Sequence, residues 1–221
     1  MENFNWHNLL NPQFYIELGG FWLILFIVFA ETGLLVGFFL PGDSLLFVSG
    51  IYATELISNT FGSTGSEFLD TALFASCIAF AGIIGNSVGY WFGKKTGPNL
   101  YERPDTFLFK KKYLYKAHDF FEEHGAFAVI AARFLPIVRT FVPVVAGIVD
   151  MDKKKFTLDN IIGAFAWSFT MIFAGHYLDS LFKTQFDIDL KKHLEIIVLS
   201  IVLITTLPIL YKILFGKIKE K

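Results

Sequence analysis

Apolar stretches of membrane-spanning length alternate with short polar segments along this chain. Three of them have the length of a helix that crosses a bilayer: 72–93, 161–178 and 194–215. The segments 20–40, 44–57 and 126–149 are also apolar, but charged residues, prolines and glycines interrupt or separate them. Irregular backbone at membrane depth needs cover from protein or a watery cavity. The pattern therefore predicts an all-α integral membrane protein that holds broken segments inside its bundle.

Lysine and arginine are distributed unevenly around these segments. Both flanks of 126–149 are basic, at 94–116 and 153–155, whereas both flanks of 21–57 contain acids but no lysine or arginine. Basic loops stay in the cytoplasm, so each broken segment must enter and leave the membrane on one side. We therefore predict two re-entrant hairpins that enter from opposite sides, the second turning near Pro136–Thr140. The basic C-terminus is expected to be cytoplasmic.

The two halves of the chain share one plan, because each has a broken hairpin followed by a span rich in small residues. The sequence thus predicts an inverted repeat, which is typical of transporters with a site near the bilayer midplane. Segment 101–124 mixes lysines with aromatic residues, which favours a basic helix on the inner membrane surface over a solvated loop. We expect an N-terminal segment, a membrane domain with two halves, and a C-terminal helix with a basic tail: 1–19, 20–180 (halves 20–100 and 120–180) and 194–221.

Composition narrows the classes of function. Hydrophobic residues make up 54% of the 221 residues, too many for a soluble domain of this size. The net charge of −1 gives no electrostatic footprint for nucleic acid. The first twenty residues contain no lysine or arginine, so we expect no cleavable signal peptide. The only cysteine, Cys77, excludes an internal disulfide.

Motifs for enzymatic chemistry are weak. The Gly-x-Ser-Gly turn of an intramembrane serine protease is absent, and His176 alone does not make the nucleophile of a lipid phosphatase. The histidines His118, His124 and His176 show no metal-ligand spacing. We therefore predict that the protein is not an enzyme and needs neither a metal nor a cofactor.

Arg133 and Arg139 are the strongest candidates for a functional site. A charged residue near the bilayer centre costs about 2.5–3.5 kcal/mol on insertion scales, and arginine cannot escape by losing its proton. Each arginine therefore needs an anion, either from this protein or from a ligand. The planar guanidinium fits two phosphate oxygens at once. The pair is interpreted as a phosphate-binding site, with an internal ion-pair lock between the hairpins as the alternative.

Glu31 and Asp43 are the complementary acids. Two acids and two arginines balance to zero, as a buried network requires. Glu31 interrupts a long apolar run where ionisation is unfavourable, so it is a candidate proton carrier or a counter-ion for an arginine. Asp43 follows Pro41-Gly42 and precedes a helical stretch, which is typical of an N-cap, without excluding a role in ion coupling.

Prolines, glycines and a threonine are expected to support the hairpin turns: Pro41, Gly42, Pro136, Thr140 and Pro143. Glycines 82, 85, 89 and 93 lie on nearly one face of a helix and permit close helix contact. That glycine face is a candidate surface for a homodimer.

A series of motifs extends along the chain: Glu31-Thr32-Gly33, Pro41-Gly42-Asp43-Ser44-Leu45, Gly89-Tyr90-x2-Gly93, His124-Gly125, Arg133-Phe134-x-Pro136-x2-Arg139-Thr140-x2-Pro143-x2-Ala146-Gly147, Phe156, Asn160, Gly163-Ala164 and Trp167. Together these motifs resemble the DedA (VTT-domain) family of membrane proteins over roughly residues 20–180. One departure is the run from Gly175 to Asp179, where the family has a Gly-Tyr pair followed by a later glycine, and this puts a role for His176 in doubt.

The resemblance implies two facing re-entrant hairpins and lipid translocation. Bacterial members are similar to flippases that recycle undecaprenyl phosphate with the proton motive force, and eukaryotic relatives are similar to phospholipid scramblases. The family's functional residues correspond to Glu31, Asp43, Arg133 and Arg139. We expect a multi-pass protein of the bacterial inner membrane that binds a polyprenyl phosphate or an anionic phospholipid. A scramblase, a proton or ion antiporter and a non-transporting scaffold are the alternatives.

Overall fold

The computed structural model describes residues 12–34, 42–102, 111–186 and 190, and these residues are almost entirely helical. The predicted C-terminal helix 194–215, the basic tail and Pro41 lie outside the described residues, as do residues 1–11. The helices are α1 (Pro12–Gly33), α2 (Gly42–Ile51), α3 (Ala53–Phe61), α4 (Glu67–Glu102), α5 (Lys111–Ala132), α6 (Pro136–Ile148) and α7 (Lys153–Phe186).

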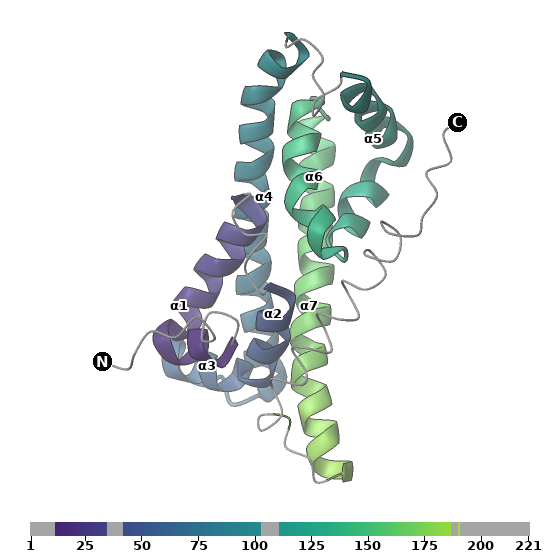
Figure 1. The fold of residues 1–221 in the computed structure, drawn as a ribbon. Coiled ribbons are helices and arrows are strands. Elements are labelled where there is room, and N and C mark those ends of the chain that lie inside the picture. Colours follow the sequence, from purple (N-terminus) through teal and green to yellow (C-terminus); the bar gives the residue numbers. More distant parts are fainter. Residues whose placement is uncertain (1–11, 35–41, 103–110, 187–189, 191–221) are drawn as a thin grey trace.

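Two long helices, α4 and α7, pack side by side and run in opposite directions (Figure 1). They contain 36 and 34 residues, so each is about 50 Å long at roughly 1.5 Å per residue. Both are long and apolar enough to cross a membrane. The predicted spans 72–93 and 161–178 form their central parts, and both helices continue beyond the roughly 30 Å hydrocarbon core of a bilayer.

The shorter helices form two hairpins that approach each other from opposite ends of this pair. In Figure 1, α1 rises from the lower end and α2 returns to it, whereas α5 descends from the upper end and α6 returns upward. The C-terminal end of α4 and the N-terminal ends of α5 and α7 lie together at the upper end. Both basic flanks of the second hairpin are therefore at the same end, as the distribution of lysines predicts.

Each hairpin packs against the long helix of the other half. The carbonyl of Val144 on α6 lies where a side chain at Gly93 of α4 would be, and Gly147 of α6 likewise meets the Tyr90 carbonyl. The first hairpin repeats this arrangement on α7: Gly50 of α2 meets the Ile172 carbonyl, and Gly175 meets that of Phe47. Glycine allows these close approaches because it has no Cβ. The glycines thus join the two halves.

The predicted glycine face of α4 is covered inside the protein. Gly85 packs against Gly33 of α1, and Gly89 would bring a Cβ to 3.4 Å from Pro143 of α6. This face is therefore not available as a homodimer surface.

The first helix of each hairpin is broken at a glycine. Gly20 in α1 has φ 52° and ψ −136°, and Gly125 in α5 has φ 44° and ψ −121°. Residues with a side chain rarely adopt this backbone conformation. The two breaks are a second sign that the halves share one plan.

Two expectations differ from the structure. The segment 44–57 divides at Tyr52 into α2 and α3, and α3 continues beyond the segment to Phe61. The second hairpin turns at 133–135, earlier than Pro136–Thr140, because Pro136 starts α6. Proline suits the first turn of a helix, where its missing N–H has no partner to lose.

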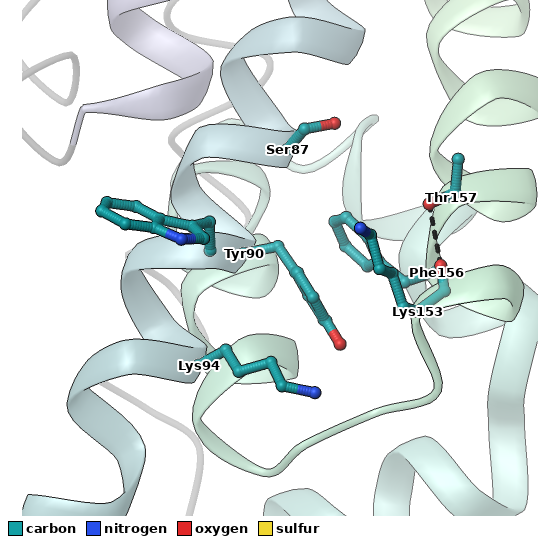
Figure 2. A pocket seen from close by; sticks show the side chains of 7 residues that line it. Ser87, Tyr90, Lys94, Lys153, Phe156 and Thr157 are labelled. Atoms are coloured by element: carbon teal, nitrogen blue, oxygen red, sulfur yellow. Dashed lines mark hydrogen bonds between the residues drawn. The ribbon is translucent and has the colours of Figure 1, made fainter.

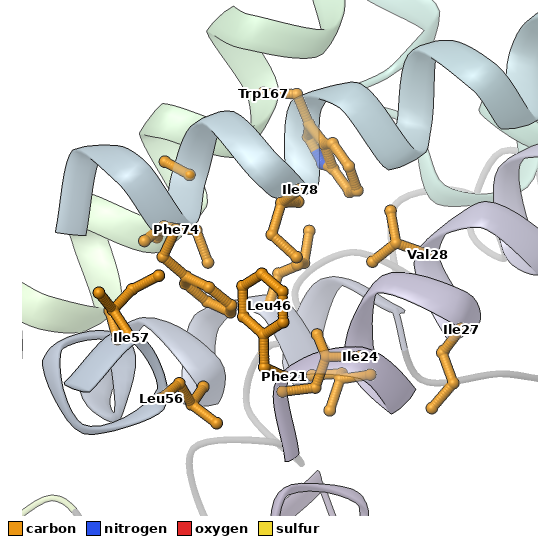
Figure 3. Packing of buried hydrophobic residues seen from close by; sticks show 14 residues of the cluster. Phe21, Ile24, Ile27, Val28, Leu46, Leu56, Ile57, Phe74, Ile78 and Trp167 are labelled. Atoms are coloured by element: carbon orange, nitrogen blue, oxygen red, sulfur yellow. The ribbon is translucent and has the colours of Figure 1, made fainter. Parts of the chain in front are cut away.

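The main core joins α1, α2, α3, α4 and α7. Apolar side chains from these helices are buried where the helices meet (Figure 3), among them Phe21, Ile24, Val28, Leu46, Phe74, Ile78 and Trp167. Large apolar side chains are also exposed, among them Trp22, Phe26, Phe80 and Phe127. A soluble monomer rarely exposes so much apolar surface, whereas a membrane protein turns such side chains toward lipid.

Candidate functional site

Arg139 lies where the two hairpins meet. It is on the first turns of α6, and its guanidinium forms ion pairs with Glu31 near the end of α1 and with Asp43 at the start of α2. Glu31 and Arg139 are only 3% and 4% exposed. A buried charge needs a partner of opposite sign, and Arg139 has two. This cluster ties the second half of the chain to both helices of the first hairpin.

Trp167 of α7 completes the surroundings of Arg139. The guanidinium carbon lies 4.8 Å from the centre of the indole ring, within the range of a cation–π contact. The indole N–H donates a hydrogen bond to the Asp43 carboxylate at 3.1 Å. Trp167 thus orients both an acid and the arginine.

Arg133 occupies a different environment. It lies in the turn between α5 and α6 and is 3% exposed, yet no carboxylate among the described residues forms an ion pair with it. Its guanidinium donates to the side-chain oxygen of Asn160 at 2.6 Å and to the Gly82 carbonyl at 3.4 Å. The cation is therefore held by neutral oxygens, which do not cancel its charge.

Two asparagines link α4 and α7 beside this arginine. Asn86 donates to the Asn160 oxygen at 3.0 Å, and Asn160 donates to the Ile83 carbonyl at 3.1 Å. If the Asn86 amide is turned over, its oxygen accepts from Arg133 at 2.8 Å. Sequence reasoning missed Asn86, although a polar amide within the apolar, charge-free stretch 72–93 is a signal that could have identified it.

Hydrogen-bonding capacity remains unused at both arginines. The Nε atoms of Arg133 and Arg139 and the Oε2 atom of Glu31 are buried and have no hydrogen-bond partner among the described residues. Glycines give the side chains room, since a Cβ at Gly163 would lie 3.1 Å from the Arg133 Cδ. Buried polar atoms are normally satisfied, so these unpaired atoms indicate a site that binds something or changes its pairing.

The structure changes the predicted roles of several supporting residues. Gly42 begins α2 and packs against the Glu31 carboxylate, so its small size makes room for the acid. Asp43 lies in the first turn of α2, and its carboxylate accepts from two side chains, Arg139 and Trp167. Thr140 and Pro143 lie inside α6, away from the turn, and Thr140 is buried beside Arg139.

The four predicted charges do not form one balanced network. Glu31 and Asp43 both pair with Arg139, which leaves Arg133 with amides and a carbonyl. Among the described residues, no group of three or more His, Cys, Asp or Glu side chains is placed to hold a metal ion. The arrangement thus contains one guanidinium paired with two carboxylates and one that is held by neutral oxygens.

Comparison with known proteins identifies the family. Residues 40–177 match the VTT domain. The chain is 36% identical over 201 residues to Protein DedA of Escherichia coli, which covers 90% of this chain and 85% of that protein. It is 34% identical to an uncharacterized membrane protein of Mycobacterium tuberculosis (92% and 85% covered) and 29% identical to the inner membrane protein YqjA of E. coli (79% and 73%). No solved structure gives a significant match. The chain belongs to the VTT domain family and is a membrane protein of the DedA type.

Proposed function

We propose that this protein is a lipid transporter that moves a phosphate-bearing polyprenyl lipid, undecaprenyl phosphate, across the bacterial inner membrane with its C-terminus in the cytoplasm. The observation that carries this proposal is the buried Arg133, whose positive charge has no carboxylate partner among the described residues. A lipid phosphate supplies the missing anion. Membership of the DedA family supports the proposal at the level of a membrane protein with transport as its expected role.

The two arginines take different roles in this scheme. Arg133 receives the phosphate, because its Nε is unpaired and its other partners are neutral oxygens that can be exchanged. Arg139 serves as the lock between the hairpins while Glu31 and Asp43 hold it. Trp167 lies beside both arginines and so couples the two sites. The centre of its ring is 5.9 Å from the Arg133 guanidinium carbon and 4.8 Å from that of Arg139.

Glu31 is the proposed proton carrier. One of its carboxylate oxygens pairs with Arg139, and the other is buried and has no partner in the part of the chain that the structure describes. A proton on this acid removes its charge and weakens the ion pair that joins α1 to α6. Asp43 then remains as the counter-ion of Arg139, so the contact between the hairpins loosens, and the phosphate held at Arg133 compensates part of the Arg139 charge as well. Protonation and phosphate binding favour each other in such a cycle, as reciprocal coupling requires.

A non-transporting scaffold is the second candidate, and the doubly paired Arg139 favours it, because a structural lock needs no ligand. That reading leaves Arg133 without an explanation. A buried cation with only neutral partners destabilises a protein, so a purely structural protein has no reason to keep it.

The test is lipid flux in liposomes that contain the purified full-length protein. The probe is a polyprenyl phosphate with a fluorophore near its phosphate, and an impermeant quencher added outside reports its exchange between leaflets. We expect Arg133→Gln to lower this flux at least about tenfold, because charge-assisted hydrogen bonds contribute about 1.5–3 kcal/mol. Lys183→Gln, an exposed change at the far end of α7, should leave the flux unchanged.

A phosphatidylcholine with the same fluorophore separates the alternatives. Equal flux of both lipids would indicate a scramblase, and no protein-dependent flux of either lipid would favour the scaffold. Native flux by a folded Arg133→Gln protein would place phosphate recognition elsewhere.

A further inference from the structure

A pocket of about 310 Å³ lies between α4 and α7 toward the basic end of the protein. Its lining includes Tyr90, Trp91 and Lys94 from α4 and Lys153, Phe156 and Thr157 from α7. In the view of Figure 2, the Lys94 and Lys153 side chains lie on opposite sides of the Tyr90 side chain.

The floor of this pocket is rigid. The rings of Tyr90 and Phe156 stack with their centres 4.4 Å apart and an interplanar angle of 20°. The Tyr90 hydroxyl also donates to the Met151 carbonyl at 2.6 Å, which ties α4 to the segment before α7. Both rings are buried. The shape of the pocket therefore does not depend on a ligand.

The donors that the pocket offers are cationic. Ser87, at the rim, donates to the Ile83 carbonyl at 2.7 Å, and Thr157 donates to the Lys153 carbonyl at 2.8 Å. Both hydroxyls therefore donate their hydrogen bonds to backbone carbonyls of their own helices. The ammonium groups of Lys94 and Lys153 remain, and they select an anion.

These two lysines differ in their pairing. Among the described residues, the structure gives the Lys153 ammonium no ion-pair or hydrogen-bond partner. Lys94 lies 2.6 Å from the Asp150 carboxylate, but both side chains are more than half exposed. Exposed ion pairs are weak, so an incoming anion can replace Asp150. Asp150 itself follows α6 with φ 55°, a conformation that directs the chain toward α7.

The wall of the pocket fits a lipid better than a small ion. The exposed Trp91 side chain adjoins the two lysines, and tryptophan and lysine together are typical of the membrane–water interface. Lys95 adds a further positive charge, 5.1 Å above the Trp91 ring. Five lysines and two aspartates lie at positions 94, 95 and 150–155, so the local charge is positive.

We propose that this pocket is a second lipid site, which holds the phosphate of an anionic phospholipid between Lys94 and Lys153 and its glycerol backbone against Trp91. The site is separate from the one at Arg133. Gly82, which contacts Arg133, precedes Tyr90 by eight residues on α4, or about 12 Å along the helix. This site is additional to the proposed transport site. The phospholipid bound there is not the transported lipid and lies at the surface of the bundle, between α4 and α7.

Native mass spectrometry of the full-length protein with added dioleoyl phosphatidylglycerol or dioleoyl phosphatidylcholine tests the site. We expect preferential binding of phosphatidylglycerol. Lys153→Gln should weaken it about fivefold, equivalent to about 1 kcal/mol for one lysine at an anionic lipid. Asp150→Asn should strengthen it, because Lys94 is then unpaired, and misfolding would not produce a gain. Lys183→Gln is the matched control and should change nothing.

Three results would overturn this site. Phosphatidylcholine could bind as tightly as phosphatidylglycerol, Lys153→Gln and Lys183→Gln could behave alike, or millimolar inorganic phosphate could displace the lipid, which would make the site one for free phosphate. Arg133→Gln separates this proposal from the transport proposal. Phosphatidylglycerol binding should survive that change, and its loss would mean that the two sites are one.

Discussion

Arg139 and Glu31 form a buried ion pair across 108 positions of the sequence. The pair joins α6 of the second hairpin to the end of α1 in the first. Asp43 adds a second ion pair to the same guanidinium. Because both halves contribute, the pair forms only when the two hairpins have docked, and its strength controls how firmly they stay together.

The lock predicts a specific pattern of stability. Arg139→Gln should destabilise the folded protein by about 3–5 kcal/mol, because two carboxylates are left buried without their cation. The double change Glu31→Gln with Arg139→Gln should recover part of this loss, since one unpaired acid is removed. Thermal denaturation of the purified variants in detergent measures both. Strictly additive losses would mean that the two side chains do not interact.

The hairpin architecture could be predicted from the distribution of lysines and arginines. Basic flanks on both sides of 126–149 and basic-free flanks around 21–57 require each segment to return to its own side. The four charged residues of the candidate site could also be selected from the sequence, because bilayer energetics single out any charge in an apolar run. Neither inference needs the register of one helix against another.

The pairing among those charges could not be predicted, because it depends on that register. Arg133 and Arg139 are six residues apart and look equivalent in the sequence, yet only Arg139 reaches the acids. The contacts of Trp167 and Asn86 in the site could not be predicted for the same reason, since aromatic and amide side chains acquire a role only from what packs beside them. The glycines of α4 predicted close contact correctly, but not that α1 and α6 are the partners.

Opposite entry of the hairpins predicts a labelling pattern. In a Cys77→Ala background, single cysteines at Ser58 and Glu67 should react with an impermeant thiol reagent added outside intact cells. Cysteines at Lys112 and Lys154 should not react, because these positions lie at the other, basic end of the bundle. Labelling of Lys112→Cys but not of Lys154→Cys would make the second hairpin a simple span.

Glu31→Gln should separate lipid binding from proton coupling. Glutamine resembles the protonated acid, so it cannot exchange a proton and pairs only weakly with Arg139. We expect the variant to bind polyprenyl phosphate while its flux in proteoliposomes no longer responds to an imposed pH gradient. Flux without a gradient provides the reference for each protein. A folded Glu31→Gln protein that responds fully to the gradient would exclude Glu31 as the proton carrier.

Asn160→Asp tests whether Arg133 receives the substrate phosphate. The Asn160 oxygen already lies 2.6 Å from the Arg133 guanidinium, so an aspartate of almost the same shape places a carboxylate there. Its second oxygen loses the hydrogen bond that the Asn160 amide donates to the Ile83 carbonyl, and the new ion pair with the buried cation offsets that loss. The buried cation then has an internal anion, and its charge is no longer available to a ligand. We expect polyprenyl phosphate flux to fall about tenfold or more, while the melting temperature in detergent stays level or rises. The combination is informative because most substitutions at a buried position lower stability and activity together.

Asn160→Ala is the control: it removes the same hydrogen bond without supplying a charge, so it should lower stability but leave Arg133 able to bind phosphate. If Asn160→Asp is stable and transports at the native rate, the unpaired charge of Arg133 does not recognise the lipid, and the arginine is structural.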